Sequence, residues 1–105
     1  MRITISHDRR KAEIIEAVDR SFNDLFKSSA QLPAKITVQE RTWRGSILNF
    51  ALTAKWGPLS TPIKGIVEVT DRDVTVDADL GLLNRFISEN TARTVLTDRV
   101  KGLLK

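Results

Sequence analysis

The chain contains no cysteine and a single histidine, His7. The absence of cysteine excludes disulfides, thiolate zinc sites and a cysteine nucleophile, and it does not discriminate between cellular compartments. With one histidine, a metal site built on two imidazoles cannot form within one chain. The segment 71–79 offers four aspartates as metal ligands. It lacks the glycine and the terminal glutamate of an EF-hand loop, so we interpret it as a solvated strand.

Long apolar runs are also absent. No run approaches the roughly 18 residues of a membrane span, and no apolar stretch follows the charges of the first ten residues. The sequence therefore predicts a soluble, cytoplasmic protein. Its 105 residues predict a single domain over residues 1–105, which buries about two thirds of the surface that the unfolded chain exposes.

Catalytic motifs are equally scarce. A serine hydrolase needs its serine beside a histidine base, but no G-x-S-x-G occurs, and Ser6 next to His7 is more simply a helix cap. The segment 56–65 holds glycine and lysine, yet its two prolines remove the run of backbone amides that would cradle a phosphate. The sequence therefore predicts no catalytic, cofactor-binding or metal site, and a protein that is not an enzyme.

Charge is unevenly distributed along the chain, whose formal net charge is +4. Residues 35–64 carry five bases against one acid, and residues 65–80 carry five acids against one base. Two interpretations stay open. The basic segment binds an anionic partner, such as nucleic acid or an acidic protein. Alternatively, the basic and acidic segments form neighbouring strands and their charges stabilise each other.

The N-terminal part of the chain predicts a strand followed by a helix. Residues 2–6 alternate as in a short strand, and residues 7–29 change to the period of a helix. Ser6 or Asp8 is expected to cap the first turn, and the segment 28–33 is expected to end the helix. The apolar stripe is expected to lie on a sheet; it comprises Ala12, Ile14, Ile15, Val18, Phe22, Leu25 and Phe26. The expected water-facing residues are Glu13, Glu16, Arg20 and Asn23.

Four further strands are predicted from alternation with a period of two. They are residues 35–43, 46–56, 63–70 and 74–80, joined by a hairpin turn at Arg44–Gly45, a loop at 57–62 and a tight turn at 71–73. The residues expected to face the helices include Leu48, Phe50, Leu52, Ala54, Trp56, Val74, Val76, Ala78 and Leu80. Thr75, Asp77 and Asp79 are expected to point outward.

The segment 81–105 predicts a second helix with a defect in its pattern. One apolar patch contains Leu82, Leu83, Phe86 and Ile87, and another contains Ala92, Leu96, Val100, Leu103 and Leu104. The two patches are displaced around the helix, so a straight helix would press Arg93 toward the core. Because burying an unpaired guanidinium is expensive, we expect a bend or break near residues 88–91, or an Arg93 that snorkels or pairs with a carboxylate.

These elements predict an α+β fold, with an antiparallel sheet of about four to five strands and two helices on one face, in the order β-α-β-β-β-β-α. Large aromatics on the helix-facing side anchor a core more often than they stack on bases, so Trp56 is predicted to be core and a nucleic-acid role is not favoured. The environment of Trp43 stays open. The candidate interaction surface comprises His7, Trp43, Arg44, Lys55 and Arg93.

The ladder "TWRGSILNF", followed by "GIVEV", "VTVDADLGLL" and an amphipathic C-terminal helix, resembles the polyhydroxyalkanoic acid system family, small bacterial proteins of the polyhydroxyalkanoate granule region. The likeness spans most of the chain, and His7 stands where that family tends to have a histidine before its first helix. The matching positions are Trp43, Gly45, Leu48, Phe50, Gly65, Ile66, Val67, Val69, Val74, Val76 and Leu80.

This resemblance implies a non-enzymatic accessory protein of bacterial polyhydroxyalkanoate metabolism, whose partner is the granule surface or a granule protein. Adsorption to an apolar polyester needs exposed amphipathic surface, and the displaced C-terminal helix is the expected source. Two alternatives remain: a module that holds an apolar ligand between helices and sheet, and one that binds an anionic partner through residues 35–64. Whether an exposed edge strand pairs two copies into a homodimer is also open.

Overall fold

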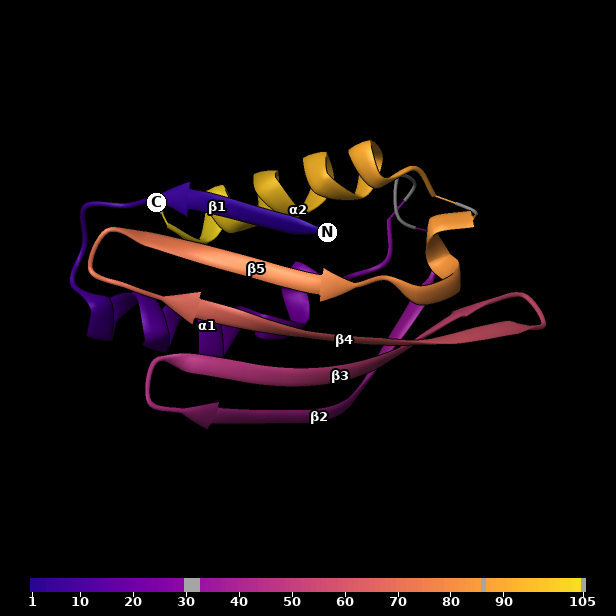
Figure 1. Ribbon diagram of the computed structural model, residues 1–105, viewed down its shortest axis with the longest axis horizontal. Helices are drawn as coiled ribbons and strands as arrows, with labels where there is room; N and C mark the ends of the chain where they lie inside the picture. The colour runs from indigo at the N-terminus through magenta and orange to yellow at the C-terminus, as the bar shows by residue number, and fades with distance from the viewer. Residues whose placement is uncertain (30–32, 86, 105) are drawn as a thin grey trace.

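The computed structural model describes residues 1–29, 33–85 and 87–104. The elements are β1 (Arg2–Ser6), α1 (Lys11–Leu25), β2 (Lys35–Arg44), β3 (Ile47–Trp56), β4 (Leu59–Val69), β5 (Asp73–Asp79), the 3-10 helix η1 (Gly81–Arg85) and α2 (Glu89–Leu103). The strands form one antiparallel sheet in the order β1-β5-β4-β3-β2 (Figure 1). The predicted α+β fold and its β-α-β-β-β-β-α order are confirmed.

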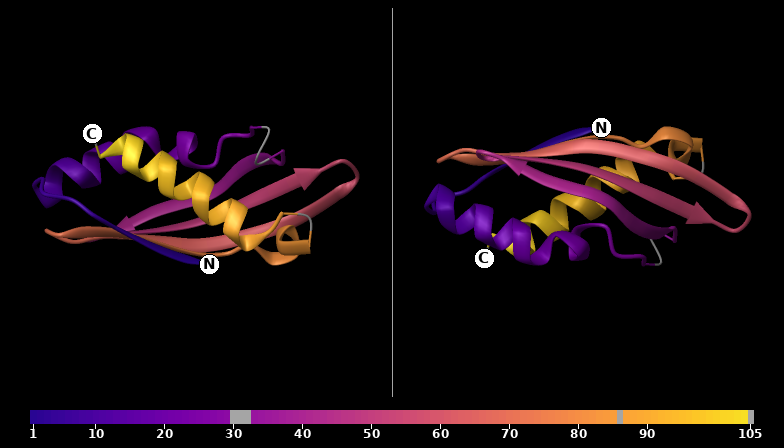
Figure 2. Two further views of the ribbon diagram at one scale, coloured as in Figure 1. Left: turned by 90° about the horizontal axis from the view of Figure 1, so that it is seen from above. Right: turned by 90° about the horizontal axis from the view of Figure 1, so that it is seen from below.

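Both helices lie on the same face of the sheet, which gives two layers (Figure 2). Successive residues of a strand point to opposite faces, and the inward positions of β3 and β5 are apolar. Those predicted to face the helices are buried, apart from the half-buried Trp56. Thr75 lies on the outer face, as predicted, since Val74 and Val76 beside it point into the core, but its side chain is only 7% exposed. Its strand has neighbours on both sides, and its hydroxyl oxygen lies 3.0 Å from that of Thr4.

The hairpin between β2 and β3 turns one residue later than predicted. Arg44 pairs with Ile47, so Gly45 and Ser46 form the two-residue turn and Arg44 belongs to the strand. Gly45 has a φ of 60°. A positive φ at the first central position matches the turn to the twist of the flanking strands, and glycine adopts it without strain.

The segment 57–62 is not the predicted loop. Gly57 and Pro58 form the turn, and β4 already begins at Leu59. Pro62 suggested a break because it cannot donate a backbone hydrogen bond. It lies opposite Thr53 of β3, but the pairing of β4 with β5 starts only at Lys64. β4 therefore has one open edge at Pro62, where a missing N–H is tolerated.

Helix α1 is shorter than predicted at both ends. Neither Ser6 nor Asp8 caps it, because Ser6 still belongs to β1 and the N-cap is Arg10, without a side-chain cap. At the other end the helix stops at Leu25, before the predicted segment 28–33, of which residues 30–32 lie outside the described residues. The four predicted water-facing residues are exposed, whereas Ala12 is exposed and Ala17 takes its place in the buried stripe.

Of the outcomes expected for the C-terminal segment, the structure shows a break near residues 88–91. η1 ends at Arg85, and α2 starts after Ser88, whose hydroxyl accepts a hydrogen bond from the Thr91 N–H (3.1 Å) as an N-cap. The break turns both apolar patches to the core, since Leu83, Ile87, Leu96 and Val100 are buried. Leu82 is exposed, and Phe86, which the sequence placed in the first patch, lies outside the described residues.

Three phenylalanine rings fill the space between α1 and the sheet. The centroids of Phe22, Phe26 and Phe50 are 5.3 to 5.5 Å apart, in tilted and edge-on arrangements that suit aromatic pairs. All three side chains are buried. At these rings the place in which the sequence allowed an apolar ligand, between this helix and the sheet, is occupied by the protein's own side chains. An open depression of about 480 Å³ remains between the end of α1 and β2.

Candidate functional site

The five residues of the predicted interaction surface do not come together. His7 lies in the link after β1, Trp43 on the inner face of β2, and Arg93 on α2. Arg44 and Lys55 are both exposed on the outer face, but at opposite ends of the β2–β3 hairpin. The structure therefore distributes these residues over several surfaces, and each has its own environment.

Trp43 is half-buried and packs against the core. Its Nε1–H donates to Oδ1 of Asp19 on α1 (3.0 Å), and Arg41 Nη2 donates to the same oxygen (2.6 Å). The Arg41 guanidinium also lies 5.0 Å from the centroid of the Phe22 ring, within the range of a cation–π contact. Trp43 and Arg41 thus hold β2 against α1, and Arg41 does not contribute to the basic outer face.

The Asp19 contacts predict a pH-dependent stability. The hydrogen bonds from Trp43 and Arg41 lower the pKa of Asp19 below its ordinary value of 3.8. A carboxyl with a lowered pKa in the folded state adds stability above its unfolded pKa, and this stability is lost as the pH falls through the folded value. Below pH 3.8 the wild type should therefore lose stability more steeply than Asp19→Asn. Urea unfolding over a pH series measures this, and parallel curves would contradict it.

His7 uses both ring nitrogens within the protein. Its Nδ1 accepts a hydrogen bond from the Arg9 N–H (3.1 Å), so the neutral ring carries its proton on Nε2 and donates to the Thr70 carbonyl (2.8 Å). The His7 N–H also donates to the Arg72 carbonyl (2.8 Å). His7 therefore fastens the link between β1 and α1 to the β4–β5 turn, which is a structural role.

The outer face of the sheet mixes both signs of charge. Lys64 lies opposite Asp79 of β5, and Arg2 of β1 lies opposite Asp77, an arrangement that is mildly stabilising between neighbouring strands. Lys35 and Lys55 face each other and leave one end of the β2–β3 hairpin basic. The register places the aromatic side chains of β2 and β3 on the inner face. The outer face of these two strands thus offers no platform on which bases could stack.

An apolar cluster at the tip of the β3–β4 hairpin was not predicted. Trp56 and Leu59 lie opposite each other at the ends of the two strands, and η1 brings Leu82 beside them, since the Leu82 N–H donates to the Thr61 hydroxyl (3.0 Å). Leu59 and Leu82 are each 46% exposed. Among them lies a depression of only about 10 Å³, so the cluster is a surface and not a ligand cavity. We call Trp56, Leu59 and Leu82 the hairpin patch.

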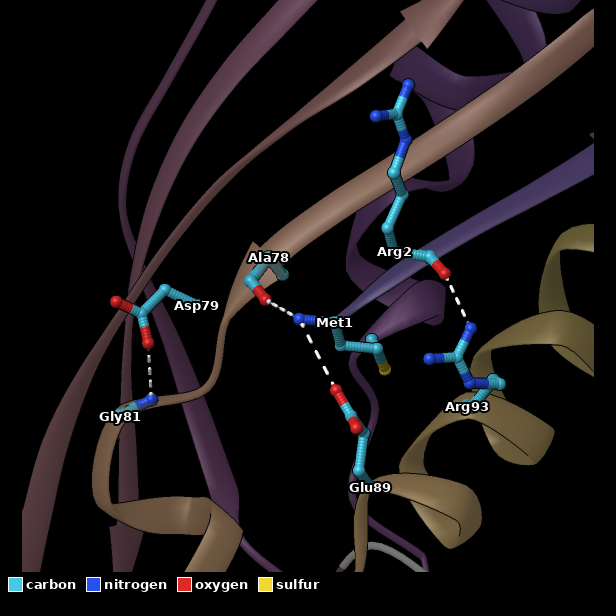
Figure 3. A network of polar contacts seen from close by, with 7 residues as sticks. All are labelled: Met1, Arg2, Ala78, Asp79, Gly81, Glu89 and Arg93. Atoms are coloured by element: carbon cyan, nitrogen blue, oxygen red, sulfur yellow. Dashed lines mark hydrogen bonds and ion pairs between the residues drawn. The ribbon is translucent and has the colours of Figure 1, made fainter.

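Polar contacts tie the start of the chain to both α2 and β5 (Figure 3). The Met1 amino group donates to the Ala78 carbonyl (2.8 Å) and lies 3.6 Å from Glu89. Arg93 is exposed as predicted for a broken helix, and its Nη1 donates to the Arg2 carbonyl (2.6 Å). The backbone carbonyl of an edge strand is therefore its partner, and not a carboxylate.

Within 1–29, 33–85 and 87–104, no three histidine, aspartate or glutamate side chains are grouped so that they could hold a metal ion. None of the helices in these ranges has the length and apolar character needed to cross a membrane.

Comparison of the chain with models of protein families, with curated proteins and with solved structures finds no match.

Proposed function

We propose that this chain is a non-enzymatic accessory protein of bacterial polyhydroxyalkanoate metabolism, and that it adsorbs to the apolar surface of the storage polyester through the hairpin patch. The resemblance to the polyhydroxyalkanoic acid system family supports this metabolic context and a location in the bacterial cytoplasm. The observation that supports adsorption is the position of Leu59 and Leu82, the two exposed large hydrophobic side chains of the described residues, in one cluster.

The exposed area of the patch is sufficient for weak, reversible adsorption. Burying a whole leucine side chain contributes about 1.5 to 3 kcal/mol, so burying the exposed half of each leucine contributes about 1 kcal/mol. The two together supply about 2 kcal/mol, or roughly a thirtyfold increase in partitioning, since 1.4 kcal/mol corresponds to a factor of ten. Further affinity would come from Trp56, whose indole suits an interface between apolar and aqueous phases.

The hairpin patch replaces the C-terminal helix as the proposed contact. The sequence suggested that the second half of this helix turns away from the core, but Leu96 and Val100 are buried, and Leu103 and Leu104 pack against the core. Exposing them would require α2 to detach from α1 and β1. Leu59 and Leu82 are already exposed without any rearrangement.

Removal of the patch tests the proposal. The double variant Leu59→Thr/Leu82→Gln keeps residue types suited to a strand and a helix, and should co-sediment with amorphous polyhydroxybutyrate particles at least tenfold less than the wild type. Ile66→Thr is the matched control, because Ile66 lies half-buried on the outer face of β4, and its retention should be unchanged. Equal retention of the double variant and the wild type would reject the hairpin patch as the contact.

A further inference from the structure

A second surface, separate from the hairpin patch, lies along the free edge of β1. A groove of about 520 Å³ runs between β1 and α2. Its floor and sides are formed by the five residues of β1 together with Arg93, Thr97 and Lys101 of α2. None of the lining residues is acidic or aromatic. The groove is therefore basic and polar, and one of its walls is a strand edge.

The backbone of this edge retains unpaired hydrogen-bonding groups. The backbone of Met1 bonds to Ala78 of β5, and the His7 N–H bonds to Arg72, directly before β5. The alternation of an antiparallel ladder therefore directs the odd residues of β1 to β5 and the even residues to the open side. The Arg2 carbonyl, on the open side, accepts from Arg93 (Figure 3). The backbone groups of Thr4 and Ser6 remain available to a further strand.

Three side chains of α2 lie along this edge at nearly the spacing of alternate side chains in a strand. Arg93, Thr97 and Lys101 are four residues apart, which spaces them by about 6 Å along a helix. Alternate side chains of an extended peptide are about 7 Å apart. Arg93 lies beside Arg2 (Figure 3), and the groove extends from there to Ser6 and Lys101. Every second side chain of an added strand would thus face one of these three α2 residues.

We propose that this groove binds an extended acidic peptide, which adds to the sheet as a sixth strand beside β1. Its backbone pairs with Thr4 and Ser6, and acidic side chains at positions i and i+4 face Arg93 and Lys101. The side chain at i+2 faces Thr97, and those at i+1 and i+3 face the outer side, where Arg2 projects away from Arg93 (Figure 3). Recognition through main-chain bonds with specificity from alternate side chains is an established mode of peptide binding.

A second copy of the chain is the less suitable occupant. If two β1 edges paired, the bases of both grooves, Arg93 and Lys101 of each copy, would lie along the same short interface. Like charges facing each other across strands are destabilising. Single-stranded nucleic acid has the right charge, but the groove has no aromatic side chain on which bases could stack.

The test uses a labelled seven-residue peptide with glutamate at positions 2 and 6 and threonine at position 4, titrated against the full chain by fluorescence anisotropy. Replacing both glutamates by glutamine should abolish measurable binding. Two isomers, N-methylated at the even or at the odd positions, separate strand addition from charge attraction, because only alternate amides of a strand face its neighbour. One isomer should lose binding and the other should keep it.

Protein variants locate the site. Lys101→Glu should weaken binding of the glutamate peptide about tenfold, since an exposed attraction becomes a repulsion. Lys55→Glu makes the same charge change on the outer face and should leave the affinity unchanged. The proposal is overturned if both N-methylated isomers bind equally, if Lys55→Glu weakens binding as much as Lys101→Glu, if a single-stranded oligonucleotide binds more tightly than the peptide, or if no binding occurs at millimolar peptide.

Discussion

Replacing Phe22 by alanine is expected to lower the free energy of unfolding by about 3 to 5 kcal/mol, the range found for buried phenylalanine. Phe22 has no exposed surface and contacts the rings of Phe26 and Phe50. Its removal leaves a cavity between two layers that cannot close without moving α1 toward the sheet. For a domain whose total stability is about 5 to 15 kcal/mol, this loss brings the protein close to unfolding.

The neighbouring position gives the matched control. Asn23 is exposed on the same helix, and Asn23→Ala should change the stability by no more than about 0.5 kcal/mol. Urea unfolding, followed by the fluorescence of the two tryptophans, measures both variants. A loss below about 1 kcal/mol for Phe22→Ala would show that the aromatic cluster is not the centre of the core.

Gly65→Ala is expected to destabilise the sheet by about 3 kcal/mol, the upper part of the range for overpacking. A Cβ at Gly65 would lie 2.4 Å from the Asp77 carbonyl oxygen, 2.7 Å from Phe50 Cζ and 2.9 Å from Ala78 Cα. Two of these atoms belong to the backbone of β5 and cannot rotate away. The added methyl group therefore separates β4 from β5 or displaces the Phe50 ring.

Gly102→Ala is the control for the same chemical change. Gly102 lies in α2, and a Cβ there would meet no atom within 4 Å. Alanine should stabilise the helix at this position by about 0.5 to 1 kcal/mol, because it loses less backbone freedom on folding. Opposite signs for the two variants in one unfolding experiment are the expected result. Two losses of similar size would mean that close packing at Gly65 is not the cause.

The inward and outward faces of the sheet could be predicted because the alternation of apolar and polar residues extends through whole strands. In β5, Val74, Val76 and Ala78 point inward in the structure as in the pattern. The break before α2 was also predictable, since two apolar patches on one straight helix would have pressed Arg93 into the core. These features depend on local periodicity, which a single sequence contains.

Features that depend on neighbouring strands could not be predicted. Pro62 suggested a loop because a proline cannot donate a backbone hydrogen bond within a sheet. It is tolerated in β4 because the pairing with β5 starts only at Lys64, and the sequence does not reveal this. The hairpin patch was missed because Leu59 and Leu82 are distant in sequence, and only η1 folding beside the hairpin brings them together. The groove along β1 likewise required the knowledge that α2 lies beside that edge.

The salt dependence of wild-type adsorption distinguishes apolar from ionic binding to the polyester. The protein would be co-sedimented with amorphous polyhydroxybutyrate particles at low and at high salt, beside an inert protein of similar size. The wild type should be retained at both salt concentrations, because apolar contacts are not screened. Retention that disappears at high salt, or no retention beyond that of the inert protein, would contradict adsorption through the hairpin patch.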